Sequence, residues 1–421
     1  MFSCCAILIS MTMSRDIAPP GRPVRANANS PVGARDVQRS RGLPDHSPSP
    51  RGAALVPPSV REPILPESGR RGRGALTNKS GRYEPQSRTV LDDGWDTIEE
   101  APPPLKTHVT EETARHIITR NSSPDIGFDR SINAYRGCEH GCVYCFARPT
   151  HAYMGLSAGL DFESKLFAKP NAADLLRKEL AKPGYKVAPI AMGTNTDPYQ
   201  PIEQRYRITR SLLEVLSEFN HPVTILTKSA RITRDLDILT SLAKRNLVRV
   251  ALSVTTLDPR LARALEPRAS TPARRIEAIR ILAQAGIPTG AMIAPIIPAL
   301  NDAEIEKLLT GVAYAGAESA NFVILRLPLE IRDLFVEWLE EHVPDRASRV
   351  MSLIRQMRGG KDYDSTWGER QSGTGPYAWQ IARRFEIATK KLNLNKRPLE
   401  SRTLDCTQFM VPGRGKQLDL L

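Results

Sequence analysis

The strongest constraint on the fold is a regular alternation of two sequence patterns between Ser131 and about residue 330. Short runs rich in β-branched and other apolar residues, which are typical of buried strands, alternate with amphipathic stretches at helical spacing. Strict alternation of strand and helix predicts right-handed crossovers and a parallel sheet. The predicted strands cover residues 132–138, 187–196, 222–229, 247–256, 287–298 and 319–327.

These six strands are enough for most of a barrel but fewer than the eight of a complete one. We therefore expect an α/β fold built on a partial (β/α)6 TIM-like barrel at residues 120–330. One helix has clear boundary signals, with Thr271 as N-cap, Pro272 at the first helical position and Gly286 just past its end. From residue 331 to 421 the apolar spacing is mainly helical, which predicts a C-terminal extension with a flexible tail.

Residues 1–104 are rich in Pro, Arg, Gly and Ser and show no sustained helical or strand period, which predicts a disordered basic arm. Residues 1–89 contain 14 Lys and Arg against 6 Asp and Glu, so +8 of the formal net charge of +13 lies there. A basic arm can bind polyanions without sequence specificity, which makes nucleic acid a candidate partner. A solvated arm without a partner is the commoner meaning of such a composition.

The apolar stretch at residues 1–14 has no leading positive charge and is too short to span a bilayer, and a start at Met11 or Met13 explains it equally well. No later stretch is long and apolar enough for a membrane span. The six cysteines do not form a disulfide framework, which suits a reducing compartment. We expect a cytoplasmic protein with no membrane association.

The stretch "YRGCEHGCVYCFARP", residues 135–149, places Cys138, Cys142 and Cys145 in one loop after the first predicted strand. Three soft thiolates favour zinc, copper(I) or an iron–sulfur cluster. A structural zinc site needs four ligands, and the next cysteine along the chain is Cys406. A [4Fe-4S] cluster normally takes four cysteines, so three leave one iron open to a small molecule.

The spacing Cys138-x3-Cys142-x2-Cys145, with Tyr144 before the last cysteine, resembles the signature of the radical S-adenosylmethionine (SAM) superfamily. The segments "GTNTDPYQPIE", "LTKS" and "LEPRASTPARRIEAIRILAQAG" follow in order and resemble the branch related to spore photoproduct lyase. The resemblance implies that the three cysteines ligate a [4Fe-4S] cluster whose fourth iron binds SAM. It also implies an external electron donor, and reductive cleavage of SAM to a 5′-deoxyadenosyl radical that abstracts hydrogen from a substrate.

Polar residues at the ends of the predicted strands are candidates for binding SAM, and for each of them an ordinary cap or turn role is the alternative. Glu266 and Arg268 either contact SAM or pair with each other. Arg136 and His140 either donate to sulfur or SAM or are exposed loop charges, and His151 is expected to be structural. The SAM candidates are Thr194, Asn195, Thr196 and Asp197 for the ammonium, Lys228 for the carboxylate, Ser253 and Thr255 for the ribose, and Tyr144 and the Phe146 backbone for the adenine.

The chain departs from the spore photoproduct lyase pattern in one respect. Those lyases carry an additional cysteine, a hydrogen donor, in the segment that corresponds to "MGTNTDP", and this chain has none between Cys145 and Cys406. Repair of a DNA photoproduct is therefore a minor alternative, which needs Cys406 over the barrel mouth or Tyr153 or Tyr199 as the donor. A further alternative is a non-catalytic iron–sulfur or zinc accessory protein that binds DNA or the sliding clamp.

The last five residues, Gln417 to Leu421, read "QLDLL" and resemble the short peptide by which bacterial repair proteins bind the DNA sliding clamp. A free end rich in glycine suits a peptide ligand. The clamp is therefore a second candidate partner. The alternatives for these residues are a disordered tail or a strand at the sheet edge.

Overall fold

A computed structural model of the chain describes residue 66 and residues 68–84, 103–396 and 403–413. The "QLDLL" peptide at residues 417–421 and most of the predicted arm lie outside the described residues. The prediction of a clamp peptide therefore stays a prediction.

The central element is a sheet of seven strands in which six parallel strands stand side by side in chain order. This confirms the mixed α/β fold expected from the alternating pattern. Register pairs such as Ile190 with Val223 and Val223 with Val248 align the strands over their buried residues. The strands of this sheet, from one edge to the other, are β10 (Ser319–Ile324), β9 (Thr289–Ile296), β8 (Val248–Ser253), β7 (Val223–Thr227), β6 (Ile190–Met192), β3 (Arg130–Ile132) and the antiparallel β2 (Ile118–Arg120).

The first predicted strand, residues 132–138, is wrong in its extent. β3 ends at Ile132, and the chain then passes into a second sheet as β4 (Tyr135–Arg136). There Tyr135 pairs with Ala168 of β5 (Lys165–Ala168), and β1 (His108–Glu111) pairs with the other side of β5. The cysteines therefore lie in a loop that is anchored by the small sheet and not on the end of a central strand.

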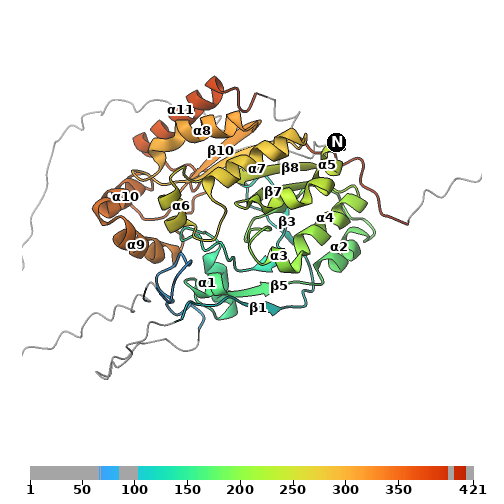
Figure 1. Cartoon of the computed structure of the whole chain (residues 1–421), viewed down its shortest axis with the longest axis horizontal. Helices are drawn as coiled ribbons and strands as arrows, with labels where there is room; N and C mark the ends of the chain where they lie inside the picture. The colour runs from blue at the N-terminus through green and yellow to red at the C-terminus, as the bar shows by residue number, and fades with distance from the viewer. Residues whose placement is uncertain (1–65, 67, 85–102, 397–402, 414–421) are drawn as a thin grey trace, which may run out of the picture. The chain divides into compact units, whose positions relative to one another are not determined.

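The crossover helices pack on the central strands through a continuous apolar core (Figure 1). α7 begins after Thr271, has Pro272 in its first turn and is followed by Gly286 at φ +73°, as predicted. The helices of this part are η1 (Arg148–Met154), α1 (Asp161–Ser164), α2 (Ala172–Leu180), α3 (Glu203–Tyr206), α4 (Ile208–Glu218), η2 (Ala230–Asp235), α5 (Leu236–Lys244), α6 (Pro259–Leu265), α7 (Pro272–Gln284), η3 (Asp302–Glu304) and α8 (Ile305–Tyr314).

The part of the chain after β10 is mainly helical, as expected. It contains α9 (Ile331–His342), α10 (Pro344–Gln356) and α11 (Gly375–Lys391). α9 and α10 form an apolar cluster with Cys142, Val143 and Tyr144, and the indole of Trp338 donates a hydrogen bond to the Ala264 carbonyl (3.0 Å). The helical extension thus covers one side of the cysteine loop. No helix of the described segments has the combination of length and apolarity that a membrane crossing requires.

Residues 68–84 correct the prediction of a disordered arm through residue 104. Ala75 and Leu76 are almost completely buried, and the backbone N–H groups of Gly74 and Ala75 donate to the buried carboxylate of Glu163 (2.9 and 2.8 Å). We call residues 68–84 the N-terminal strap. Its order comes from contacts with residues far along the chain, which local composition does not reveal.

The free edge of β10 is covered by C-terminal segments. The Ile324 N–H donates to the Gln371 carbonyl (2.8 Å), and the neighbouring Arg370 pairs with Asp125 in the loop between β2 and β3 (2.7 Å). In a flat sheet β10 and β2 would lie six strand spacings, or about 29 Å, apart. Residues 370 and 371 contact both β10 and the loop between β2 and β3, which indicates that the sheet is strongly curved.

Candidate functional site

The cysteine loop and the polar turns lie at one end of the central sheet. The cysteine loop follows β4, which comes just after the carboxyl end of β3, and the turns that contain Asp197, Lys228 and Thr255 follow the carboxyl ends of β6, β7 and β8. Ligands of parallel α/β sheets bind at this end. The turns that contain these candidate residues therefore lie at the same end of the sheet as the cysteine loop.

Two glycines give the cysteine loop its path. Gly137 and Gly141 have φ angles of +74° and +69°, a region that favours glycine. A Cβ on Gly137 would lie 2.8 Å from the Phe162 carbonyl oxygen, and one on Gly141 would lie 2.6 Å from a Glu163 carboxylate oxygen. The loop therefore packs too closely against α1 to accept a side chain at either position.

Arg148 fixes the backbone of the cysteine loop through hydrogen bonds, a role that the sequence analysis did not predict. Its guanidinium is fully buried and donates to the backbone carbonyls of Gly141 (3.1 Å) and Cys142 (2.8 Å). It also forms an ion pair with the equally buried Glu163 (2.6 Å). Because Glu163 in turn accepts from the N-terminal strap, one buried carboxylate connects the strap, Arg148 and the cysteine loop.

The three cysteines are free and lie close together, Cys138 and Cys142 buried and Cys145 partly buried. Burial, with the nearby Asp197 and the other two thiols, raises the pKa of Cys138 well above its usual value. Burial also raises the pKa of Cys142 to about 12, against the opposing effect of Lys228. Three thiolates in such a place need a bound positive charge, so the donor set fits a soft metal centre.

Within the described segments, no group of three or more His, Cys, Asp or Glu side chains is arranged to hold a single metal ion. A closed zinc site draws its ligands tightly around one ion. A four-iron cluster spaces its cysteine sulfurs more widely.

Asp197 is occupied by donors from the protein itself. Its carboxylate accepts hydrogen bonds from the Thr227 hydroxyl (2.6 Å) and the Lys228 N–H (2.7 Å), and lies 3.4 Å from the buried His140 ring. Burial acts to raise its pKa, but the His140 charge and these hydrogen bonds outweigh burial and hold the pKa at about 2. Asp197 thus connects the turn after β6 to the turn after β7 through hydrogen bonds.

The rest of the "GTNTDP" turn is held by Asn133, a residue that the sequence did not point to. The Asn133 side chain bonds with the Thr194 hydroxyl (3.1 Å) and accepts from the Asn195 N–H (3.0 Å) and, at 3.4 Å, the Thr196 N–H. The Thr196 residue is buried, whereas Asn195 is exposed. The Asn195 side chain therefore remains available at the surface of the site.

A buried charged cluster lies behind Tyr144. Glu266 forms an ion pair with Arg275 and accepts from the hydroxyls of Tyr144 and Thr255. Although burial opposes ionisation, Arg275 and Lys228 lower the Glu266 pKa to about 2. The ammonium of Lys228 lies 5.6 Å from the centre of the Tyr144 ring. No hydrogen-bond partner is found for that ammonium in the described part of the chain.

Several other predicted residues have internal partners. Ser253 donates to the Ala294 carbonyl (3.1 Å), the Thr255 hydroxyl lies 3.0 Å from the same carbonyl oxygen, and both residues are almost completely buried. Glu266 and Arg268 do not pair with each other, because Arg268 pairs with Glu139 of the cysteine loop.

The loop residues around the cysteines also have defined places. Arg136 pairs with Glu112 at the surface (3.0 Å). His151 is buried, and its ring bonds to the Lys165 carbonyl (2.9 Å), which agrees with a structural role. Phe146 is 50% exposed, unlike the buried Tyr144.

The residues considered as hydrogen-atom donors to a product radical do not lie together at this site. Cys406 lies at the opposite end of the sheet, because the adjacent Asp405 N–H donates to the Asn246 carbonyl, just before β8 (3.0 Å). Tyr199 is fully buried, and Tyr153 is 72% exposed and stacked on Tyr83 of the N-terminal strap.

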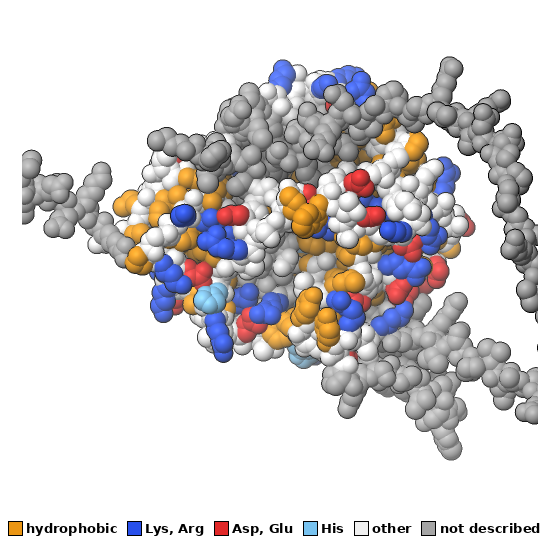
Figure 2. All heavy atoms as spheres, turned by 180° about the vertical axis from the view of Figure 1, so that it is seen from behind, with side chains coloured by type: hydrophobic (Ala, Val, Ile, Leu, Met, Phe, Trp, Pro, Cys, Tyr) orange, Lys and Arg blue, Asp and Glu red, His pale blue; other side chains and the backbone are white. Residues whose placement is uncertain are grey.

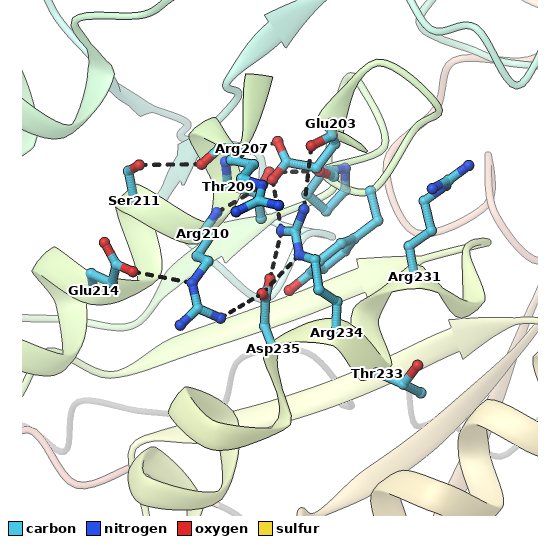
Figure 3. Close-up of polar contacts among 12 residues, drawn as sticks. Glu203, Arg207, Thr209, Arg210, Ser211, Glu214, Arg231, Thr233, Arg234 and Asp235 are labelled. Carbon is cyan, nitrogen blue, oxygen red and sulfur yellow. Dashed lines mark hydrogen bonds and ion pairs between the residues drawn. The ribbon is translucent and has the colours of Figure 1, made fainter. Parts of the chain in front are cut away.

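A second polar network supports the cysteine loop from the side of α3 and α4. The Tyr135 hydroxyl donates to Glu203, which pairs with Arg234 (2.8 Å). Figure 3 shows Arg234 between Glu203 and Asp235, and Arg210 reaching the same Asp235. Glu203 and Asp235 are completely buried, so this network fixes η2 and the start of α4 relative to β4.

Comparisons with known proteins agree with this geometry. Residues 132–310 match the Radical SAM superfamily. The uncharacterized protein Rv2578c of Mycobacterium tuberculosis is 38% identical over 231 residues, which are 54% of this chain and 68% of that protein. The uncharacterized protein MJ0683 of Methanocaldococcus jannaschii is 32% identical over 173 residues, 41% of this chain and 62% of that protein.

Two solved structures are more distant. Spore photoproduct lyase complexed with a dinucleoside spore photoproduct is 16% identical, with a TM-score of 0.48 and coverage of 68% of this chain and 79% of that one. SuiB of Streptococcus suis bound to S-adenosylmethionine is 20% identical, with a TM-score of 0.27 and coverage of 38% and 35%.

Proposed function

Because this chain belongs to the radical SAM superfamily of enzymes, we propose that Cys138, Cys142 and Cys145 bind a [4Fe-4S] cluster at which SAM is cleaved reductively. The observation that carries the proposal is the set of three thiols, two buried and one partly buried, on one loop at the carboxyl ends of six parallel strands. The bound cluster and SAM supply an electron and a 5′-deoxyadenosyl radical for hydrogen abstraction from a substrate. The chain supplies the ligands, the orientation and the exclusion of water.

The central sheet is proposed to form a partial (β/α)6 barrel. The contacts of residues 370 and 371 with both Asp125 and β10 support this curvature. The cysteine loop then lies at the carboxyl-end mouth of the barrel, and α9 and α10 shield it on one side.

Lys228 is proposed to bind the SAM carboxylate. Its ammonium faces the cysteine loop, lies beside Tyr144 and has no hydrogen-bond partner among the residues described, so a ligand carboxylate would satisfy it. For the SAM ammonium, Asn195 is the better of the predicted acceptors, since Asp197 is already occupied by internal donors. Tyr144 and the Phe146 backbone remain the proposed neighbours of the adenine, and Ser253 and Thr255 those of the ribose.

The proposed partners follow from the chemistry. Reduction of the cluster requires an external electron donor, and free thiols suit the cytoplasm. Nucleic acid and the sliding clamp remain proposed partners through the basic arm and Gln417–Leu421. Photoproduct repair through Cys406 gains no support, because this cysteine lies at the other end of the sheet. The accessory-protein alternative predicts DNA or clamp binding that survives loss of the cluster.

The experiment is anaerobic reconstitution of the full chain with iron and sulfide, followed by addition of SAM and dithionite. We expect a brown protein that releases 5′-deoxyadenosine, and a Cys142→Ala variant that releases none. The matched control is Cys406→Ala, which should keep both colour and activity. A fully reconstituted wild-type protein that forms no 5′-deoxyadenosine would overturn the proposal.

A further inference from the structure

Two neighbouring arginines, of which Arg326 lies beside the residue that follows Cys145, form no direct hydrogen bond to a carboxylate of the described residues. Arg326 lies just beyond the end of β10, and Arg358 follows α10. Neither forms an ion pair with any described residue. Arg358 is buried and donates only to the carbonyls of Leu325 (3.1 Å) and Glu369 (2.8 Å). Burial and the nearby Arg326 both lower the Arg358 pKa.

Arg326 is incompletely satisfied. Its Nη2 donates to the Tyr363 hydroxyl (3.3 Å), but its Nε is buried and has no hydrogen-bond partner. A buried N–H group without a partner is unfavourable, and two neighbouring guanidiniums that are not directly bonded to a carboxylate repel each other. The carboxyl groups of Asp364 and Glu369 are near Arg358 but bond to neither guanidinium. Arg326 therefore lacks both a full set of acceptors and a directly bonded carboxylate, and an anionic ligand would supply both.

The position of this pair connects it to the proposed chemistry. The Arg326 guanidinium lies 5.5 Å from the centre of the Phe146 ring, and Phe146 directly follows Cys145. The Phe146 ring is half exposed, so a planar group can stack on its free surface. An anion-binding guanidinium beside an exposed aromatic ring matches the two parts of a nucleotide, its phosphate and its base.

We propose that Arg326, Arg358 and Phe146 bind a nucleotide unit of the substrate, with the phosphate on the guanidiniums and the base on the Phe146 ring. The assignment as a substrate site rests on the proposed radical SAM function. Phosphate fits this site better than carboxylate, because it carries more charge toward two arginines and comes with a stacking group. We call these three residues the Arg326 site.

The face of the molecule in Figure 2 does not offer an alternative of the same kind. On the face in Figure 2, basic, acidic and apolar side chains are interspersed, without one continuous basic surface. The arginines near α3 and α4 are largely engaged, since Arg210 and Arg234 pair with Asp235 and other carboxylates. The Arg326 site is thus distinguished by an unpartnered Nε beside an exposed aromatic ring, and not by its number of arginines.

The test uses the reconstituted full chain and fluorescence anisotropy with a labelled ten-nucleotide single strand. Unlabelled deoxynucleoside 5′-monophosphate, the matching nucleoside and inorganic phosphate serve as competitors. We expect the monophosphate to bind about tenfold more tightly than the nucleoside, as one charge-assisted contact implies. Tighter binding of the strand than of the monophosphate would identify nucleic acid as the source, and equal binding a free nucleotide.

Variants separate the two halves of the site. Arg326→Gln should weaken monophosphate binding about tenfold and leave nucleoside binding unchanged. Phe146→Leu should weaken both about fivefold, because stacking is lost. Arg280→Gln, an exposed arginine on α7, is the matched control and should bind like the wild type. The iron–sulfur absorption and SAM binding of Arg326→Gln and Arg280→Gln should be unchanged, which shows that both variants fold, and the circular dichroism spectrum provides this check for Phe146→Leu.

Wild-type affinity in Arg326→Gln would overturn the inference, as would loss of SAM binding in the same variant, which would make Arg326 part of the cofactor site. Release of 5′-deoxyadenosine is measured on the same preparations. If the protein releases 5′-deoxyadenosine but nucleotide binding does not depend on Arg326, only this inference is refuted. If nucleotide binding depends on Arg326 but no 5′-deoxyadenosine is released, the proposed function is refuted and the nucleotide site still stands.

Discussion

Arg148 and Glu163 form a fully buried ion pair, with Nη2 2.6 Å from Oε1, directly beneath the cysteine loop. Glu163 also accepts hydrogen bonds from the N–H groups of Gly74 and Ala75 in the N-terminal strap. The position of the proposed cluster ligands therefore depends on two residues that do not themselves bind iron.

Glu163→Gln tests this dependence. The substitution leaves Arg148 buried without its counter-charge, which typically costs about 3–5 kcal/mol of the free energy of unfolding. We expect a lower denaturant midpoint and a reduced iron content after reconstitution. Glu277→Gln breaks an exposed pair with Arg280 and should leave both quantities unchanged. Equal midpoints for the two variants would show that the buried pair does not support the loop.

Gly74→Ala tests the strap. A Cβ at this position would lie 1.9 Å from the Gly141 carbonyl oxygen, so the strap must move away from the cysteine loop. We expect faster proteolysis within residues 68–84 and loss of iron content. Gly72→Ala is the matched control, because its Cβ meets no atom within 4 Å and only its φ of +74° opposes alanine. Similar behaviour of the two variants would refute a close contact between strap and loop.

Lys228→Met tests the proposed carboxylate contact. Loss of one charge-assisted hydrogen bond should weaken SAM binding about tenfold or more, while the iron–sulfur absorption stays the same. Lys178→Met, on the exposed surface of α2, should not change SAM binding. Isothermal titration under anaerobic conditions measures both. Unchanged SAM affinity in Lys228→Met would remove this residue from the site.

His221 predicts a dependence of stability on pH. Its Nδ1 bonds to the Pro222 carbonyl and its Nε2 to the Tyr185 hydroxyl, and burial lowers its pKa to about 3. The unfolded chain, with a pKa near 6.5, therefore binds a proton that the folded chain does not. Stability from this group is present above pH 6.5 and falls by about 2 kcal/mol between pH 7 and pH 5.

The check is the denaturant midpoint of His221→Asn at both pH values. This variant keeps a donor for Pro222 but cannot titrate, so the loss between pH 7 and pH 5 should shrink relative to the wild type. His108→Asn, on the exposed β1, should retain the full loss. An unchanged loss in His221→Asn would mean that the imidazole is already protonated in the folded protein.

Much of the site could be predicted from the sequence because its signals are local. The strand–helix alternation, the cysteine spacing and the polar turns after the strands each occupy a short stretch, and the fold brings them to one end of the sheet. Residues such as Arg148, Glu163 and Asn133 could not be found in this way. Their roles depend on partners far along the chain, as with Glu163 and Gly74, which are 89 positions apart.

Asp197 illustrates a second limit. The sequence places it in the turn after a predicted strand, but a sequence does not show which donors reach a carboxylate. Here Thr227, Lys228 and His140 come from two other loops and take up its oxygens. The prediction of disorder for the N-terminal strap was wrong for the same reason. A composition rich in Arg and Gly does not reveal that the buried Glu163 carboxylate accepts hydrogen bonds from this segment.

The most direct test of the account is the electron paramagnetic resonance spectrum of the reduced, reconstituted protein with and without SAM. A cluster held by three cysteines, with one iron open to SAM, predicts a [4Fe-4S]⁺ signal that changes when SAM is added. The Lys228→Met variant should need more SAM to show the same change. A wild-type signal that is identical with and without saturating SAM would contradict the central claim.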